Sequence, residues 1–98
     1  EPGCYRQGAW GIRIENLLAV TPPAVPEGGE REMLGFETLT LAPIDRRLIV
    51  PQLLDPSDRA WLDAYHARVA EEIGPLLADP DDAAARAWLS AATAPLAD

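Results

Sequence analysis

The sequence predicts an α+β chain in which strands come first and two helices come last. Apolar and polar residues alternate from Ile12 onward, which is typical of a strand. Two helix-start signals, Asp55-Pro56 and Asp79-Pro80, are each followed by apolar residues at helical spacing. Strand signals therefore fill the first part of the chain, and helix signals fill the last third.

The first predicted strand lies within residues 5–20. Its uninterrupted apolar tail, Leu17–Val20, suits a strand that is covered on both faces. A second predicted strand spans Met33–Pro43. Between them, residues 21–32 contain three prolines and two glycines. The prolines have no backbone N–H to donate, and the glycines have no side chain to pack. We expect a solvated loop there, either mobile or an excursion between paired strands.

The first predicted helix begins with Asp55 as its N-cap and Pro56 at its first position. Apolar residues then recur every four positions and indicate one buried face of an amphipathic helix. These residues are Trp61, Tyr65, Val69 and Ile73. Gly74-Pro75 ends or bends this helix, and Asp79 starts a second, shorter helix that contains Trp88. The three tryptophans, at positions 10, 61 and 88, are expected to anchor a core or an interface.

Charge and composition exclude several classes of partner. The 98 residues carry eight basic and sixteen acidic side chains, for a net charge of −8. Such a chain lacks the cationic face that nucleic acid or an anionic membrane requires. No apolar run approaches the roughly 20 residues that span a bilayer. A single cysteine, Cys4, forms no internal disulfide and favours a reducing compartment.

Two glutamates are the first candidates for chemistry. The chain opens with Glu1-Pro2-Gly3 instead of Met, which we interpret as a cut, processed or trimmed start. Glu15 interrupts an otherwise apolar segment, so its carboxylate needs an ion-pair, hydrogen-bond or metal partner. Arg13 lies two residues earlier on the same strand face. Spacing alone favours an Arg13–Glu15 ion pair and leaves a metal site as the alternative.

The remaining reactive residues give weaker signals. Cys4 could act as a nucleophile only with a base in reach, and the one histidine, His66, lies far along the chain. One Cys and one His also lack the ligand spacing of a closed zinc site. We expect His66 to lie near the apolar helix face, with a nearby carboxylate or carbonyl as its partner.

Four motifs carry a resemblance to a known family. Glu1-Pro2-Gly3-Cys4-Tyr5 followed by Gly8–Asn16, which contains Gly-Ile-Arg-Ile-Glu-Asn, resembles the end of the metal centre in Xaa-Pro aminopeptidases. These are dimetal peptidases of the pita-bread fold. Further matches to the long, eukaryotic-type branch cover almost the whole chain. They lie at Leu34–Ile44, at Trp61–His66, and at Trp88-Leu89 with Thr93–Leu96.

The resemblance implies roles for four residues. Glu1 corresponds to a terminal ligand of one metal that also shuttles a proton, and is therefore catalytic. Glu15 corresponds to the carboxylate that bridges both metals. Arg13 would orient Glu15, while Tyr5 either reaches the edge of the site or simply packs. Two divalent ions, most often Mn²⁺, are implied for a full-length enzyme, with two aspartates and a histidine upstream as the other ligands. Without these ligands the chain alone would bind none stably.

The implied function is that of the C-terminal part of a cytosolic metallopeptidase. Residues 1–44 would be the last strands of the pita-bread catalytic domain, and residues 45–98 a two-helix C-terminal extension. The parent would hydrolyse the N-terminal Xaa-Pro bond of peptides with proline second, whereas the chain alone would be inactive. Expected partners are these peptides, the rest of the parent chain and a second copy. The alternative is an interaction or dimerisation module without catalysis.

Overall fold

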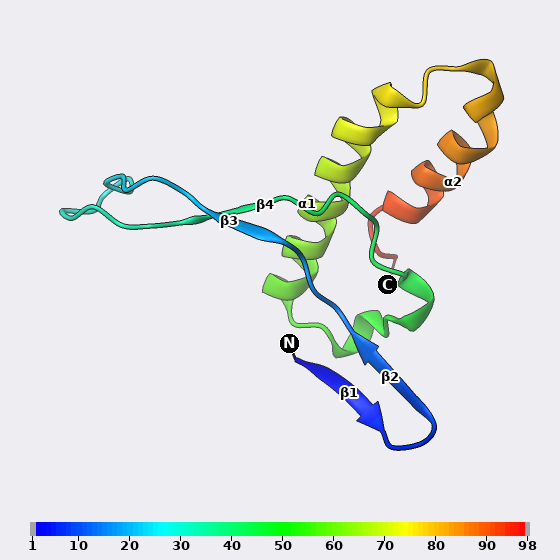
Figure 1. Cartoon of the computed structure of the whole chain (residues 1–98), viewed down its shortest axis with the longest axis horizontal. Helices are drawn as coiled ribbons and strands as arrows, with labels where there is room; N and C mark the ends of the chain where they lie inside the picture. The colour runs from blue at the N-terminus through cyan, green and yellow to red at the C-terminus, as the bar shows by residue number, and fades with distance from the viewer. Residues whose placement is uncertain (1, 98) are drawn as a thin grey trace. The chain divides into compact units, whose positions relative to one another are not determined.

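The computed structural model describes residues 2–97, and the chain divides into two compact units (Figure 1). Residues 1–40 form what we call the strand unit, and residues 41–98 form the helical unit. Every residue classed as buried in the described range belongs to the helical unit. The structure confirms the α+β class, with strands first and helices last. The predicted division at residue 44, between catalytic strands and an extension, stays a prediction.

The strand unit contains two separate antiparallel pairs. Strand β1 (Gly3–Arg6) pairs with β2 (Trp10–Arg13), and β3 (Leu18–Val20) pairs with β4 (Phe36–Thr38). The prediction of one strand within residues 5–20 is therefore wrong, because the chain changes pairing partner between β2 and β3. The expectation that Leu17–Val20 is covered on both faces is also wrong within this chain. Leu18 is 50% exposed and Val20 is 61% exposed.

The proline-rich loop is an excursion between paired strands, which was one of the two expectations. It leaves β3 and returns into β4, and an isolated bridge joins Ala24 to Met33 near its tip. Gly28 has a φ of +73° there, in the left-handed region that glycine adopts without strain. The second predicted strand, Met33–Pro43, is much shorter than expected. Only Phe36–Thr38 has a partner strand, since β3 is three residues long.

Local sequence signals explain the helices. Helix α1 (Pro56–Ile73) begins where the Asp55 side chain accepts a hydrogen bond from the Asp58 amide, and it ends at Gly74. A 3₁₀ turn follows at Gly74–Leu76, as the Gly-Pro pair predicts. Asp79 caps a second 3₁₀ turn, Pro80–Asp82, that runs directly into α2 (Ala83–Thr93). Two further 3₁₀ turns, Arg46–Leu48 and Pro51–Leu53, lie between β4 and α1.

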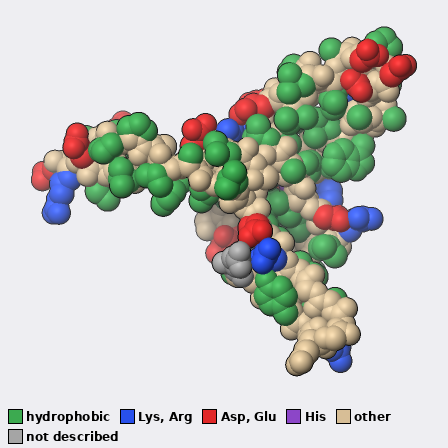
Figure 2. Space-filling view, viewed as in Figure 1, with side chains coloured by type: hydrophobic (Ala, Val, Ile, Leu, Met, Phe, Trp, Pro, Cys, Tyr) green, Lys and Arg blue, Asp and Glu red, His purple; other side chains and the backbone are tan. Residues whose placement is uncertain are grey.

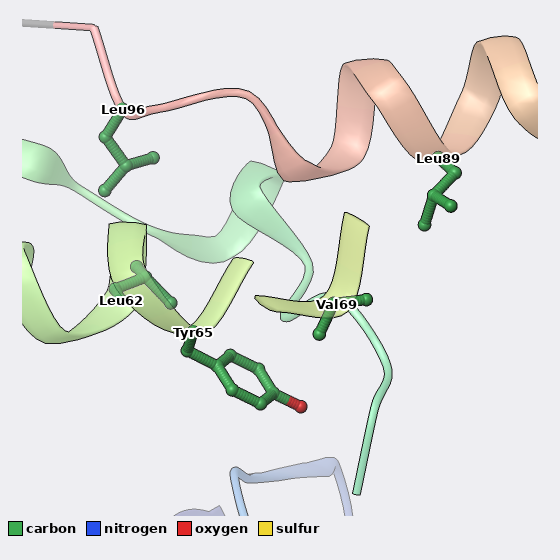
Figure 3. Close-up of a cluster of buried hydrophobic side chains, with 5 residues drawn as sticks. All are labelled: Leu62, Tyr65, Val69, Leu89 and Leu96. Carbon is green, nitrogen blue, oxygen red and sulfur yellow. The ribbon is translucent and has the colours of Figure 1, made fainter. Parts of the chain in front are cut away.

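The core of the helical unit lies where α1 meets α2 and the C-terminal tail. Its buried apolar residues are Leu62, Tyr65, Val69, Leu89 and Leu96 (Figure 3). The predicted stripe on α1 is correct for Tyr65 and Val69, while Trp61 at the rim of the core is 54% exposed and stacks on the Tyr65 ring. Trp10 and Trp88 are at least half exposed as well. Of the two expectations for the tryptophans, the core is therefore wrong within this chain, and the interface stays a prediction.

No helix in the described part of the chain is both long enough and apolar enough to cross a bilayer.

Candidate metal centre

The β1–β2 hairpin brings the residues of the first motif, Gly3 to Arg13, into a fixed register. Gly3 pairs with Arg13, and Arg6 pairs with Trp10 at the turn end. Gly8 has a φ of +70° in the turn, and the Ala9 amide donates to the Arg6 carbonyl at 3.0 Å. A left-handed residue at this position lets the two strands reverse tightly. The hairpin thus sets the direction in which the chain leaves Arg13.

Glu15 lies two residues after the end of this hairpin and forms an ion pair with Arg13. The Arg13 Nη2 atom lies 3.1 Å from Glu15 Oε1, and the two side chains are 39% and 53% exposed. The ion pair that the spacing favoured is therefore present. Such an exposed pair contributes little to stability, so its main consequence is geometric. It orients a carboxylate that remains open to solvent or to another ligand.

Backbone bonds anchor the segment just after Glu15. The Leu17 amide donates to Thr40 Oγ1 at 2.8 Å, and the Leu39 amide donates to the Leu17 carbonyl at 2.8 Å. Arg13, at the other end, is the last residue of the β1–β2 ladder. The short stretch that carries Glu15 is therefore held on both sides by hydrogen-bonded strands. Sequence reasoning missed Thr40, because its partner lies 23 residues away.

Glu1, the other predicted metal ligand, lies outside the described residues. Among residues 2–97, no group of three or more His, Cys, Asp or Glu side chains could hold a metal ion. Glu15 supplies a hard oxygen donor of the type that Mn²⁺ and similar divalent ions prefer. Its exposure and its orientation by Arg13 fit a ligand role. The described residues thus fit one part of a metal site, and the other donors have to come from elsewhere.

Tyr5 packs over the backbone of its own hairpin. A Cβ atom added at Gly11 would lie 2.7 Å from Tyr5 Cδ1, and one added at Gly3 would lie 2.5 Å from its hydroxyl oxygen. Both glycines are therefore required for the ring to lie flat on β1 and β2. Tyr5 is still 61% exposed, so one face of the ring remains open. Its predicted role beside the metal stays a prediction, and Cys4 next to it is an exposed free thiol.

His66 lies in the core of the helical unit. Its side chain is wholly buried, and its Nε2 atom accepts a hydrogen bond from the Ile44 amide at 3.0 Å. The expected carboxylate or carbonyl partner is therefore wrong, because the partner is a backbone donor. A histidine without solvent access does not meet a substrate, which agrees with its structural interpretation. Burial lowers the pKa of His66, the Arg46 charge lowers it further, and Asp63 opposes both effects.

Two adjacent arginines have very different surroundings. Arg46 donates to the carbonyls of Ala91, Ala94 and Pro95, at 2.8, 2.9 and 3.2 Å, and so caps the C-terminus of α2. Arg47 instead pairs with Asp45 on the surface, and its hydrogen bonds hold the Asp45 pKa at about 2.

A cavity of about 400 Å³ lies beside Arg46 and Arg47 and is also lined by Trp88. Sequence reasoning missed the role of Arg46, since its partners are 45–49 residues away.

Comparison with known proteins shows the class of protein. The chain belongs to the family described as the C-terminal region of peptidase M24, which matches residues 32–96. More particularly, it is similar to a probable Xaa-Pro aminopeptidase P from Coprinopsis cinerea, with 39% identity over 97 residues. It is also 43% identical over 98 residues to aminopeptidase P2 from Arabidopsis thaliana. These findings confirm the resemblance drawn from the motifs.

A solved structure supports the same assignment. The X-prolyl aminopeptidase of Caenorhabditis elegans, described as a cytosolic enzyme with a di-nuclear active site, matches with a TM-score of 0.83 and 36% identity. The match covers 97% of this chain and 15% of that protein, and it confirms the expected pita-bread peptidase fold. The Coprinopsis relative is likewise covered only to 15%, against 98% of this chain. The Arabidopsis relative is covered to 13%, against 99% of this chain.

Proposed function

We propose that this chain is the C-terminal part of a metal-dependent Xaa-Pro aminopeptidase. The parent protein would hydrolyse the N-terminal Xaa-Pro bond of peptides that carry proline in second place. The single observation that carries the proposal is Glu15, an accessible carboxylate oriented by Arg13 at the end of an ordered hairpin. Its motif matches the position of a bridging ligand in the resembling family. The identities of 39% and 43% to aminopeptidases P support the same activity.

The resemblance supports a role for Glu1 beside Glu15, because the motifs that contain them match the end of the metal centre in the family. Glutamate carboxylates are the hard oxygen donors that Mn²⁺ and similar divalent ions prefer. We therefore assign Glu15 as the ligand that would bridge the two ions, and Glu1 as a terminal ligand of one of them.

Each of these residues would have a distinct role in the hydrolysis of the Xaa-Pro bond. When bound, two divalent ions, for which we propose Mn²⁺, supply Lewis-acid activation of the attacking water. The Glu1 carboxylate would accept the proton of that water and return it to the leaving proline nitrogen. Arg13 would orient the Glu15 carboxylate toward the site through their ion pair. Tyr5 would border the site from the adjacent strand.

The surface of the strand unit indicates what surrounds it. Its exposed large apolar side chains lie on both hairpins and on the loop, and part of them is visible in Figure 2. They include Trp10, Ile14, Leu17, Val20 and Phe36. Exposed apolar patches mark interaction surfaces, and unpaired strand edges invite further pairing. We propose that the remainder of the parent catalytic domain covers them. The alternative occupant is a second copy, with the chain serving as a dimerisation module without catalysis. We place the parent in the cytoplasm, in keeping with the C. elegans neighbour.

Peptide hydrolysis tests the proposal. We expect the parent polypeptide, loaded with Mn²⁺, to release the first residue of Arg-Pro-Pro, and the 98-residue chain alone to release none. Glu15→Gln in the parent should lower the turnover by more than about 100-fold, since ligand-orienting groups alone are worth 10–100-fold. Glu27→Gln, an exposed loop carboxylate, is the matched control and should leave turnover unchanged. Full activity of the Glu15 variant would overturn the proposal.

A further inference from the structure

Two neighbouring side chains of α1 hold the backbone that leads from the strands to the helices. The Tyr65 hydroxyl donates to the Ala42 carbonyl at 2.8 Å and accepts from the Ala42 amide at 3.3 Å. His66 Nε2 accepts from the Ile44 amide at 3.0 Å. Pro43 between them has no N–H. Tyr65 and His66 therefore satisfy both amide donors of residues 42–44, which we call the connecting segment.

The bond to Ile44 determines which imidazole nitrogen carries the proton. An acceptor nitrogen is unprotonated, so the neutral ring has its proton on Nδ1. His66 is 0% exposed, and its Nδ1 atom has no hydrogen-bond partner among the described residues. Within the described residues the ring therefore accepts one hydrogen bond, at Nε2, from a buried position.

Protonation would reverse the role of His66. An imidazolium carries N–H donors on both nitrogens, so Nε2–H would face the Ile44 N–H directly. A donor that loses its acceptor in a buried site costs about 1–3 kcal/mol. The charged groups that act on His66 are Arg46, in the 3₁₀ turn after the connecting segment, and Asp63, one turn earlier on α1. Arg46 disfavours the cation and Asp63 favours it, while burial is the largest effect and disfavours it.

We propose that Tyr65 and His66 form an acid-releasable clasp on the connecting segment. Neutral His66 accepts the hydrogen bond of the Ile44 amide, and protonated His66 cannot accept it. Tyr65 keeps its hydrogen bonds to Ala42 whether His66 is neutral or protonated. Because the folded state lowers the pKa of His66 below its ordinary value of 6.5, the clasp contributes fully above that value. Its contribution falls as the pH drops through the folded pKa. This inference does not depend on the peptidase proposal, since no metal ligand or substrate takes part.

Nitrogen NMR of the imidazole tests the tautomer and the protonation state of His66 directly. His66 is the only histidine of the 98 residues, so one pair of ring signals reports it without assignment. We expect the Nδ1–H tautomer at neutral pH and a titration midpoint below 6.5. The Nε2–H tautomer, or a midpoint at or above 6.5, would overturn the clasp.

Amide exchange of Ile44 tests the release. Relative to unstructured-chain rates, wild-type protection at Ile44 should be constant above the ordinary histidine pKa of 6.5 and fall by up to about tenfold per pH unit as the pH drops from there through the lower folded pKa. His66→Gln keeps an acceptor that does not titrate, so its protection should not depend on pH. His66→Leu removes the acceptor and should lose protection at neutral pH. Identical pH profiles for the wild type and His66→Gln would refute the proposal.

Tyrosine variants provide the matched control for the other half of the clasp. Tyr65→Phe removes the hydroxyl that holds Ala42 and should lower protection of the Ala42 amide by at least tenfold. Tyr5→Phe removes the hydroxyl of the exposed tyrosine and should leave Ala42 unchanged. Equal protection of Ala42 in the two variants would remove Tyr65 from the clasp.

Discussion

Replacing Arg46 with Met should destabilise the helical unit far more than the same change at Arg47. Arg46 bonds three carbonyls at the end of α2 and the start of the C-terminal tail. Arg47 has a side chain that is 86% exposed and pairs with Asp45. The two residues are adjacent in one 3₁₀ turn and differ mainly in what their guanidinium groups contact. The comparison therefore isolates the contribution of the cap.

The size of the effect follows from the surroundings of the three carbonyls. Hydrogen bonds to a charged group contribute about 1.5–3 kcal/mol each when no water replaces them. The bonds to Ala91 and Pro95 are exposed, so water can take over there, whereas the bond to Ala94 is partly buried. We therefore expect Arg46→Met to cost about 2–3 kcal/mol, out of the roughly 5–15 kcal/mol that a domain of this size has.

Urea unfolding followed by far-ultraviolet circular dichroism measures this difference. With a denaturant slope of about 1 kcal/mol/M, the midpoint of Arg46→Met should fall by roughly 2 M, and that of Arg47→Met should barely move. Removing the Arg46 charge should also raise the pKa of His66, since this charge lowers it in the wild type. Equal midpoints for the two variants, or an unchanged His66 titration, would refute the reasoning.

Three further changes have separate outcomes. Leu89→Ala removes a 5% exposed core side chain and should cost about 2–4 kcal/mol in chemical denaturation; an unchanged midpoint would contradict the assigned core. The Asp58 amide lowers the pKa of Asp55, so the charged N-cap stabilises α1 above the ordinary value of 3.8 and loses this effect as the pH falls through the lower folded value. When helix content is followed as the pH is lowered, Asp55→Asn should remove the loss that accompanies protonation of Asp55. A pH dependence of helix content identical to that of the wild type would contradict this role of Asp55. Gly11→Ala places a Cβ 2.7 Å from Tyr5 Cδ1 and should weaken amide protection in β1 and β2, with Tyr5→Ala restoring it; no rescue would mean that the ring is not the obstacle.

Signals that act within a few residues were read correctly from the sequence. Asp55 and Asp79 cap the turns that they were expected to cap, and Gly74-Pro75 ends α1. The Arg13–Glu15 pair likewise joins residues two positions apart. In each case the interacting groups are neighbours along the chain, so their spacing alone determines the geometry.

Features that depend on distant partners were not predictable in the same way. The strand expected over Met33–Pro43 is cut to Phe36–Thr38 because its length is set by β3. The helical period places Trp61 on the same stripe as Tyr65, but only tertiary packing decides that Trp61 stays half exposed. The sequence predicts a nearby carboxylate or carbonyl as the partner of His66, yet its partner is an amide 22 residues away. A buried acceptor leaves no local trace in the sequence.

The candidate metal centre combines local and distant signals. The motif around Glu15 led to the family by resemblance, and the structure adds the hydrogen bonds that hold its segment, from Arg13 on one side and Leu17 on the other. The role of Glu1 as a second carboxylate beside Glu15 is a proposal drawn from the resemblance.

Counting the metal ions bound by the parent polypeptide tests the central claim most directly. Crystals of the parent grown with Mn²⁺ should show two anomalous peaks per polypeptide, with both ions within about 2.0–2.3 Å of Glu15 oxygens. The Glu15→Gln variant should lose at least one peak, while Glu27→Gln should keep both. Two fully occupied ions in Glu15→Gln, or two ions in the wild type that Glu15 does not touch, would contradict the account.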